Sequence, residues 1–390
     1  MDFSELTTLR VGGLAPPIVN ADSESELAQV ITEADSAGED VLVLGSGSHL
    51  VVSDRGFSGL LVRDRRKDIA EVDSYVSCGG STVKATAGTD WDTFVQFTLE
   101  NDLAGLEALS GIPGTVGAAP VQNLGAFGQE VAQTLASVRA LDRLTGRIRT
   151  LSRFDLHLGY RSSIIKRSRF SADAGGGQLW GPTGRWVVLE ASFQLRSASL
   201  SEPVRYRSLA ESLGVDLGTR VPSWELREHV LKLRAESGML LGPQDHDQLA
   251  GHDDHETDHD TWSAGSFFGN PILSSQDAAR LPEEAPRFPV RNQAMFVSGT
   301  VHKQAPLVEG KQKVPAAWLI RHAGFEPGYR ARPDSRAALS SKHVSAITNR
   351  GGATAAEIME LAAAVHDGVA AKFGISLVPE PVLVGLEGLN

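Results

Sequence analysis

The sequence has very little cysteine and no long apolar segment. Its single cysteine, Cys78, excludes an internal disulfide and any zinc or iron–sulfur site built from cysteines. No apolar run approaches the roughly 18 residues that a membrane-spanning helix needs. The first residues, from Met1 to Glu5, are acidic and lack the apolar core of a secretion signal. We therefore expect a protein of the reducing cytoplasm that has no membrane partner.

An excess of basic residues is also missing. The formal net charge is −11, and seven acidic residues with no lysine or arginine lie between Asp245 and Asp260. Without those seven charges the chain would carry only −4. Nucleic-acid binding needs a basic surface, so we do not expect a nucleic-acid partner.

What the sequence does have is an ordinary globular composition with extra glycine. The 390 residues are 41% hydrophobic and 22% charged, which suits a folded protein of two or three domains. Glycine occurs 40 times, more than the usual share of about 7%. Such an excess indicates many tight turns or a backbone that approaches a ligand closely.

Hydrophobic periodicity predicts both helices and strands. The predicted helices cover 24–37, 90–100, 223–236 and 355–373. The predicted strands cover 41–44, 50–54, 186–196 and 382–384, with further β structure across 136–150. Strands and helices do not alternate regularly, so the pattern favours an α+β fold over a doubly wound sheet.

Two glycine-rich segments are candidate ligand loops. The turn at 45–48 lacks the third glycine of the dinucleotide fingerprint and leads into a strand, which excludes a Rossmann site. It is either a plain β-turn or a nest of backbone N–H groups for a phosphate. The longer segment 110–126 has almost no bulky polar side chains, and we favour backbone contact with a large planar or phosphate-bearing ligand over a purely structural loop.

The segment from His255 to His259 matches the H-E-x-x-H pattern of zinc proteases. That motif works on an amphipathic helix with an apolar face beneath it, and the neighbouring residues are acidic or histidine. We therefore interpret 243–260 as a flexible, solvated acidic and histidine-rich loop and expect no bound metal. Ser266 is a different candidate: between Gly265 and Phe267 it is either a reactive hydroxyl in a dry pocket or a buried serine bonded to backbone.

Several segments in a fixed order carry a resemblance to a known family. They are 7–13, 45–54, 110–128, 159–163, 263–271, 313–324, 339–349 and 377–385. Together they resemble the UDP-N-acetylenolpyruvoylglucosamine reductase (MurB) family of bacterial cell-wall synthesis, in an actinobacterial-like class with an extra tyrosine loop. The resemblance covers nearly the whole chain and leaves out only 243–260.

The resemblance implies a fold and an activity. The fold is α+β, with a two-part FAD-binding region of the vanillyl-alcohol-oxidase type and a smaller α+β substrate-binding domain. The implied parts are 1–66 together with 378–390, then 67–200, then 201–377. The implied protein is a cytoplasmic monomer that uses FAD as cofactor and NADPH as co-substrate. It reduces UDP-N-acetylglucosamine enolpyruvate to UDP-N-acetylmuramate.

The resemblance also implies site residues. The catalytic residues are Arg161, which would stabilise charge beside the substrate carboxylate, Ser266, the proton donor, and Glu380. The substrate-binding residues are Tyr160, Tyr206, Asn270 and Lys313. The cofactor-binding residues are Gly45, Ser46, Gly47, Ser48, His49, Leu50, Gly111, Ile112, Pro113, Gly114, Thr115, Gly117, Ala118, Gln122, Asn123, Gly125 and Ala126.

Three positions depart from the family pattern. His49 stands where the family usually has asparagine, Ser162 where it has aspartate or histidine, and Ser237 where a lysine is common. Loss of that lysine removes a diphosphate contact, for which Lys232 or Arg234 could compensate. The alternatives are an FAD oxidase that uses oxygen and a non-catalytic flavin- or metal-binding protein. The combination of arginine, serine and glutamate favours the reductase.

Overall fold

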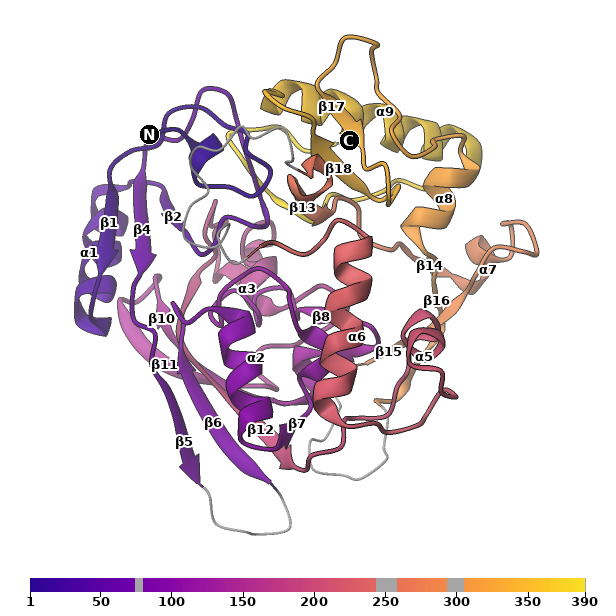
Figure 1. Cartoon of the computed structure of the whole chain (residues 1–390). Coiled ribbons are helices and arrows are strands. Elements are labelled where there is room, and N and C mark those ends of the chain that lie inside the picture. The colour runs from indigo at the N-terminus through magenta and orange to yellow at the C-terminus, as the bar shows by residue number, and fades with distance from the viewer. Residues whose placement is uncertain (74–79, 243–257, 293–304, 390) are drawn as a thin grey trace.

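The N-terminal strands form a small parallel sheet in the order β1-β4-β2. The computed structural model describes residues 1–73, 80–242, 258–292 and 305–389. In this first part the elements are β1 (Ile18–Ala21), α1 (Glu24–Ala37), β2 (Val41–Val43), β3 (Leu50–Val52) and β4 (Leu60–Asp64). The predicted helix 24–37 is confirmed: Ser23 caps its start and Gly38 ends it in the left-handed conformation. Its buried Leu27 and Ile31 pack in one cluster with Val41 and Val62 of the sheet. Figure 1 shows α1 beside β1 and β4.

The largest sheet is antiparallel and has the order β11-β10-β12-β6-β5, with the short β7 also paired to β12. Its strands are β5 (Ile69–Asp73), β6 (Ser81–Thr86), β7 (Leu103–Ala104), β10 (Leu135–Asp142), β11 (Arg147–Ser152) and β12 (Trp186–Ser197). Helix α2 (Trp91–Glu100) covers it, with the Phe94 and Phe193 ring centroids 4.9 Å apart. The β structure expected over 136–150 is the hairpin β10–β11.

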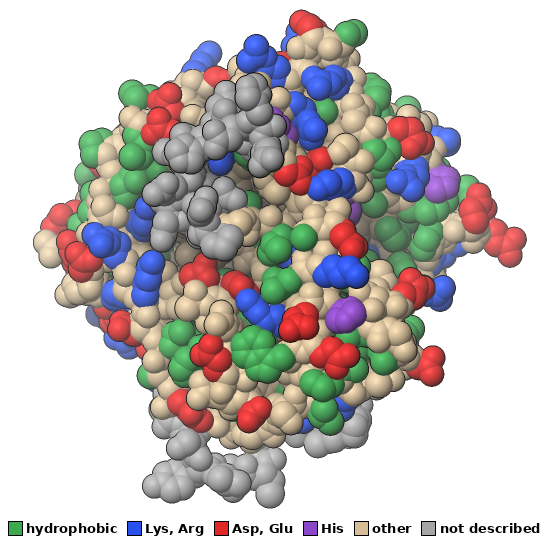
Figure 2. Space-filling view, in the orientation of Figure 1, with side chains coloured by type: hydrophobic (Ala, Val, Ile, Leu, Met, Phe, Trp, Pro, Cys, Tyr) green, Lys and Arg blue, Asp and Glu red, His purple; other side chains and the backbone are tan. Residues whose placement is uncertain are grey.

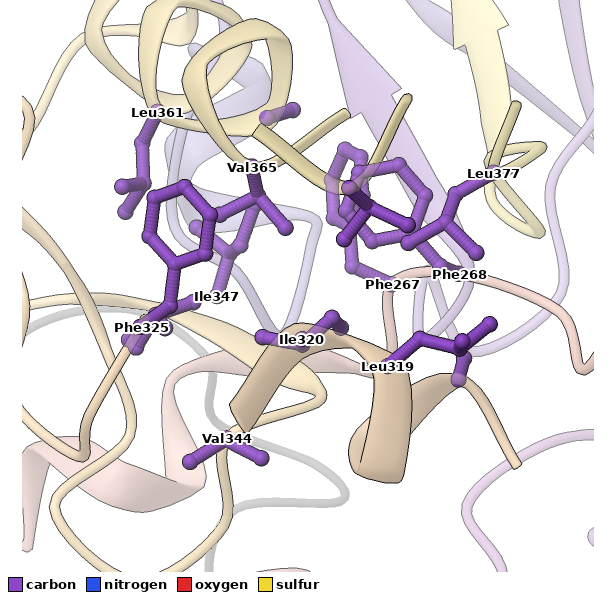
Figure 3. Packing of buried hydrophobic residues seen from close by; sticks show 14 of the residues in the cluster. Phe267, Phe268, Leu319, Ile320, Phe325, Val344, Ile347, Leu361, Val365 and Leu377 are labelled. Atoms are coloured by element: carbon purple, nitrogen blue, oxygen red, sulfur yellow. The ribbon is translucent and has the colours of Figure 1, made fainter. Parts of the chain in front are cut away.

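The described residues of the C-terminal part form two small sheets and three helices. The sheets have the orders β13-β18-β17 and β14-β16-β15. The elements are β13 (Ser263–Ser266), β14 (Ile272–Ser274), α7 (Ser275–Ala278), β15 (Phe288–Arg291), β16 (Leu307–Lys313), α8 (Ala316–His322), β17 (Ala337–Leu339), β18 (Ala346–Asn349) and α9 (Ala355–Phe373). Figure 3 shows Phe267 and Phe268 packed near Leu319, Ile320 and Leu377 in this core.

Helix α9 confirms the predicted range 355–373 because its ends carry strong local signals. Thr354 and Glu357 form a reciprocal capping box, and Gly374 ends the helix with φ +67°. The predicted strand 382–384 is also confirmed as β19 (Val382–Val384), which pairs in parallel with β3. The last strand of the chain therefore adjoins an element near its beginning.

The predicted helix 223–236 is confirmed as α6 (Ser223–Glu236), which packs with α5 (Arg207–Leu213). Arg227 of α6 donates two hydrogen bonds to Asp92 of α2, at 2.6 and 2.7 Å, and the two helices lie side by side in Figure 1. The short elements are β8 (Gly125–Ala126), β9 (Gln129–Glu130), α3 (Ile164–Arg167), α4 (Ala172–Gly175) and the 3₁₀ turns at Phe3–Glu5, Glu107–Leu109, Val131–Gln133 and His259–Thr261.

The end of the expected acidic loop requires a correction. Residues 243–257, which include His255, lie outside the described residues. The prediction of a solvated loop up to 260 is wrong at its end, because the Asp260 side chain is only 3% exposed and pairs with Arg350 at 3.0 Å. Burial raises the pKa of Asp260, but hydrogen bonds from Ser341 and Ser340 outweigh this effect and hold its pKa below the usual value. Partners about 80 residues away therefore anchor this end of the segment.

The mixture of a parallel sheet, antiparallel sheets and packed helices confirms the α+β fold class. Among the helices of the described ranges, none combines the length and apolarity required to cross a bilayer. Within those ranges no cluster of histidine, cysteine, aspartate and glutamate side chains is arranged to hold a metal. On the face shown in Figure 2, basic and acidic side chains are both spread over the surface.

Candidate active site

A cavity of about 980 Å³ lies where the loops that carry Ser48, Ile112 and Arg161 meet α6 and the C-terminal part. It brings together all the predicted catalytic and substrate-binding residues: Arg161, Ser266, Glu380, Tyr160, Tyr206, Asn270 and Lys313. Seven of the predicted cofactor residues also line it: Ser48, His49, Ile112, Pro113, Gln122, Gly125 and Ala126. Segments separated by more than 300 residues thus share one cavity.

Arg161 is held by a tight turn in which Gly159 and Ser162 pair with each other. Its φ of +49° is unusual for a residue that is not glycine, and such backbone strain clusters at functional sites. The Asn123 side chain donates to the Gly159 carbonyl at 2.9 Å and so supports the turn. The Arg161 Nε atom lies 3.4 Å from a carboxylate oxygen of Glu380. The turn therefore directs the guanidinium into the cavity beside a carboxylate.

Ser266 and Glu380 come together through backbone pairing. The Glu380 amide donates to the Phe267 carbonyl at 2.8 Å, and the Gly269 amide donates to the Val378 carbonyl at 3.0 Å. Glu380 is only 9% exposed. A Cβ atom at Gly269 would lie 3.2 Å from the Glu380 carboxylate, so the glycine leaves room for it.

An irregularity in β13 orients Ser266. The register with β18 shifts between Ser263 and Ser266, and Gly265 adopts φ +74°. Such irregularities re-aim side chains next to active sites. The Ser266 hydroxyl borders the cavity, and its oxygen lies 3.4 Å from the Ser345 hydroxyl oxygen. The interpretation of Ser266 as a serine bonded only to backbone does not match this arrangement.

Tyr160, Asn270 and Lys313 form one connected wall. The Tyr160 hydroxyl accepts from the Asn270 amide at 3.4 Å, and the Asn270 side-chain oxygen accepts from the Ala316 amide at 2.8 Å. The Lys313 Nζ atom lies 4.4 Å from the centre of the Tyr160 ring. Burial lowers the pKa of Lys313, and the nearby Glu130 carboxylate opposes this shift. The wall presents a partly desolvated ammonium group to a ligand.

Tyr206 stands at the opening, with half of its surface exposed and its ring edge against Phe127 at 5.6 Å. Two arginines that sequence analysis did not single out, Arg205 and Arg291, line the same region. Burial lowers the pKa of Arg205. The cavity wall carries more basic than acidic side chains, an arrangement that suits an anionic ligand. The basic ones are Arg161, Arg205, Arg234, Arg291 and Lys313, and the acidic ones are Glu130 and Glu380.

The two glycine-rich loops meet at one end of the cavity. The Ser48 hydroxyl donates to the Pro113 carbonyl at 2.9 Å, and a Cβ atom at Gly45 would lie 3.2 Å from the Thr115 hydroxyl. In the described part of the chain, several amides of these loops have no protein acceptor. They belong to Gly45, Ser46, Gly47, Ser48, Ile112, Gly114 and Thr115. Free amides on two adjoining turns fit a diphosphate group.

Two buried side-chain atoms also fit an absent polar ligand. His49 Nε2 and Gln122 Oε1 border the cavity and have no hydrogen-bond partner among the described residues. Buried polar atoms without a partner are rare in folded proteins. Burial lowers the pKa of His49, so its imidazole is neutral at neutral pH and has both a donor and an acceptor nitrogen. The residues present therefore fit a flavin dinucleotide.

Other predicted cofactor residues stabilise the loop at 110–126, because their polar groups hydrogen-bond to other residues of the protein. The amides of Gly111, Gly117 and Ala118 donate to Asp92, Ala87 and Thr115, respectively. Asn123 is 1% exposed, and its side chain bonds to Glu130, Gly159 and Ala132. The structure therefore places these four residues in support of the loop. Leu50, in β3, pairs with Val382.

Arg234, one of the two possible replacements for the missing lysine, lines the cavity, but its guanidinium bonds to carbonyls of the protein itself. Its guanidinium donates to the carbonyls of Gly111, at 2.9 Å, and Met239, at 2.6 Å. Burial lowers its pKa to about 10. Arg234 thus ties α6 to the cofactor loop, and Lys232 does not line the cavity.

Comparisons with known proteins agree with this arrangement. Family models describe residues 15–152 as an FAD binding domain and residues 256–384 as the C-terminal domain of UDP-N-acetylenolpyruvoylglucosamine reductase. The chain is 45% identical to the UDP-N-acetylenolpyruvoylglucosamine reductase of Saccharopolyspora erythraea, over 97% of this chain and 93% of that protein. It is 43% identical to the enzyme of the same name from Cutibacterium acnes, over 98% of this chain and 89% of that protein.

A solved structure supports the fold independently. The crystal structure of the reductase from Thermus caldophilus matches with a TM-score of 0.57 and 22% identity, over 98% of this chain and 97% of that one. At this identity the match shows a shared fold. The FAD-binding region expected from sequence is confirmed by the domain match. The identities above, extending over almost the full length of the chain, show that it belongs to the UDP-N-acetylenolpyruvoylglucosamine reductase family.

Proposed function

We propose that the cavity is where this chain reduces UDP-N-acetylglucosamine enolpyruvate to UDP-N-acetylmuramate, with FAD as cofactor and NADPH as co-substrate. When bound, FAD supplies the redox chemistry by accepting a hydride from NADPH and passing it to the enolpyruvyl double bond. The observation that carries the proposal is the meeting of Arg161, Ser266 and Glu380 in one cavity, with Arg161 and Glu380 3.4 Å apart.

Each of the three side chains has a separate task. Reduction of the double bond places negative charge on the carbon next to the substrate carboxylate, and the Arg161 guanidinium stabilises this charge by binding that carboxylate. The Ser266 hydroxyl gives its proton to the same carbon. The Glu380 carboxylate positions Arg161 and the substrate end, since it contacts the guanidinium and is held by backbone on the Ser266 side.

The two ends of the cavity hold different ligands in this proposal. The loops at 45–50 and 111–126 hold FAD, mainly through the amides that have no protein acceptor. Tyr160, Tyr206, Asn270 and Lys313 bind the substrate, with Asn270 and Lys313 near its nucleotide end. Arg205 and Arg291 supply cations for its diphosphate, in place of the lysine that is absent at Ser237.

We also propose the division into 1–66 with 378–390, 67–200 and 201–377, and a monomer in the cytoplasm. Pairing of β3 with β19 supports the assignment of the last strand to the first part. The single cysteine suits a reducing compartment. Sedimentation of the FAD-loaded protein tests the monomer, since a mass near 83 kDa, about twice 41.5 kDa, contradicts it.

The proposed reaction is tested by the loss of NADPH absorbance with purified, FAD-loaded protein. We expect rapid loss only when UDP-N-acetylglucosamine enolpyruvate is present, with a product heavier than the substrate by two hydrogens. Arg161→Ala serves as the matched inactive control. Oxygen consumption without formation of that product would instead identify an oxidase.

A further inference from the structure

Ser266 needs a source of protons because it must recover one after every turnover. Among the described residues, its hydroxyl has one hydrogen-bond partner, the Ser345 hydroxyl at 3.4 Å. The Ser345 hydroxyl oxygen in turn lies 2.6 Å from Nδ1 of His343. All three side chains line the cavity. A continuous chain of exchangeable protons therefore leads away from Ser266.

We propose that Ser345 and His343 form a proton relay that recharges Ser266. The inference rests on the proposed role of Ser266 as proton donor. Neither residue touches the reacting carbon in this proposal, so both are positioning and relay residues.

The relay is held in a fixed geometry. The Phe267 amide donates to the Ser345 carbonyl at 2.7 Å, which places Ser345 beside the residue that follows Ser266. The His343 amide donates to the Ser340 hydroxyl at 3.1 Å, which fixes the turn that carries the imidazole. Ser345 is only 4% exposed. The chain of hydroxyls therefore does not depend on a mobile surface group.

The protonation state of His343 suits the task. Burial lowers its pKa, and the positive charge of Arg321 acts in the same direction. The imidazole is therefore neutral at neutral pH, with one ring proton. With that proton on Nδ1, His343 donates to Ser345, and Ser345 is free to donate to Ser266.

The proton balance closes over one cycle. A C–H bond forms on the substrate as the Ser266 O–H bond breaks, and Ser266 then takes the hydroxyl proton of Ser345. Ser345 takes the Nδ1 proton of His343 while Nε2 gains a proton from solvent, so the ring stays neutral. Exchange with water returns the ring to its Nδ1–H form. The net result is transfer of one solvent proton to the substrate.

The test separates the two halves of the reaction. Ser345→Ala should leave the rate of flavin reduction by NADPH within about twofold and lower turnover by roughly 10- to 100-fold. This loss is smaller than the 10²–10⁴-fold expected from removal of the general acid itself, because water still reaches the cavity slowly. Ser345→Thr, which keeps a hydroxyl, should restore most of the turnover.

His343→Gln distinguishes a relay from a structural role. Glutamine can hydrogen-bond to Ser345 but does not shuttle protons, so its turnover should fall about as far as that of Ser345→Ala. Ser341→Ala is the control from the same segment, because Ser341 bonds to Asp260 and does not line the cavity. Its turnover should stay near that of the unchanged chain.

A second measurement does not depend on activity. In protein with ¹⁵N-labelled histidine, the His343 Nδ1–H signal should be shifted downfield by its short bond and should lose that shift in Ser345→Ala. Normal turnover in both Ser345→Ala and His343→Gln would overturn the relay. Slowing of flavin reduction by the same factor as turnover would also overturn it. Absence of product from the unchanged chain would instead contradict the proposed function.

Discussion

In the proposed function, the two ends of the cavity recognise their ligands by different means. The cofactor end offers backbone amides from small residues, as in the turn that contains Gly47. The substrate end offers side chains, among them Arg161, Lys313 and Ser266. At the first end, the important property of a residue is the space that it leaves and the backbone angle that it allows. At the second end, it is the functional group itself.

This difference predicts which substitutions each end tolerates. Removing a functional group should have large effects at the substrate end and small effects at the cofactor end. Adding a methyl group should have the opposite pattern. The following predictions test this contrast.

The largest effect is expected for Ser266→Ala. Flavin reduction by NADPH should be unchanged, because it needs no proton donor there, and reoxidation by the enolpyruvyl substrate should slow by about 10²–10⁴-fold. This corresponds to roughly 3–5 kcal/mol at about 1.36 kcal/mol per decade. Stopped-flow absorbance of the flavin separates the two steps, and Ser266→Cys should recover part of the rate. Unchanged reoxidation would remove Ser266 from the mechanism.

Arg161→Lys should lower turnover almost as far as Arg161→Ala, by about 10²–10³-fold. Lysine keeps the charge but loses the planar fork that binds a carboxylate at two points. Steady-state kinetics of both variants at saturating substrate measure the difference. Near-normal turnover of the lysine variant would show that a positive charge alone suffices.

Gly47→Ala should weaken FAD binding by roughly 10- to 100-fold, because forcing a side chain into this backbone costs about 1–3 kcal/mol. Gly47 has φ +67°, and an added Cβ atom would lie 1.9 Å from the Leu6 carbonyl oxygen. Ser46→Ala is the matched control: it keeps the amide and loses one hydroxyl contact to Ser48, so the dissociation constant should change less than about threefold. Flavin fluorescence titration measures both. If Ser46→Ala weakened FAD binding more than Gly47→Ala, side-chain groups and not backbone space would determine binding at the cofactor end.

Arg205→Gln should have the smallest effect at the substrate end, raising the KM for the nucleotide substrate about tenfold with kcat nearly unchanged. A hydrogen bond to a charged group contributes about 1.5–3 kcal/mol, and neighbouring cations retain part of the attraction. Initial rates across substrate concentrations separate KM from kcat. A fall in kcat with an unchanged KM would place Arg205 near the reacting atoms and not at the diphosphate.

Local sequence signals predicted the four longest described helices well, but not the shorter α3, α4, α5, α7 and α8. Thr354, Glu357 and Gly374 mark both ends of α9 within a few residues of the apolar stripe. The motifs also led to Arg161, Ser266 and Glu380, which the structure brings into one cavity. The amino-acid sequence was sufficient to predict an element whose signals lie within it, and to predict site residues that belong to a family motif.

Long-range contacts explain what sequence did not reveal. Asp260 sits in an acidic run, yet its pairing with Arg350 keeps it buried. Ser345 lies in the segment 339–349 that carries the resemblance, but sequence analysis assigned it no role; the pairing of β13 with the adjoining β18 places its hydroxyl beside Ser266. Arg234 is a possible replacement for the missing lysine by sequence, whereas in the structure its guanidinium donates to the Gly111 carbonyl, 123 positions away. In each case the residue that determines the position of the side chain is far away in the sequence, and the neighbouring residues do not reveal it.

Pairing of β3 with β19 has a consequence for biosynthesis. Glu380 is translated after every other proposed site residue, and the strand just beyond it must find a partner made more than 300 residues earlier. Until that strand arrives, β3 presents an unpaired edge, and the guanidinium of Arg161 lacks its carboxylate. In the proposed mechanism an incomplete nascent chain therefore cannot assemble the catalytic centre, and a chain that ends before Glu380 should be inactive.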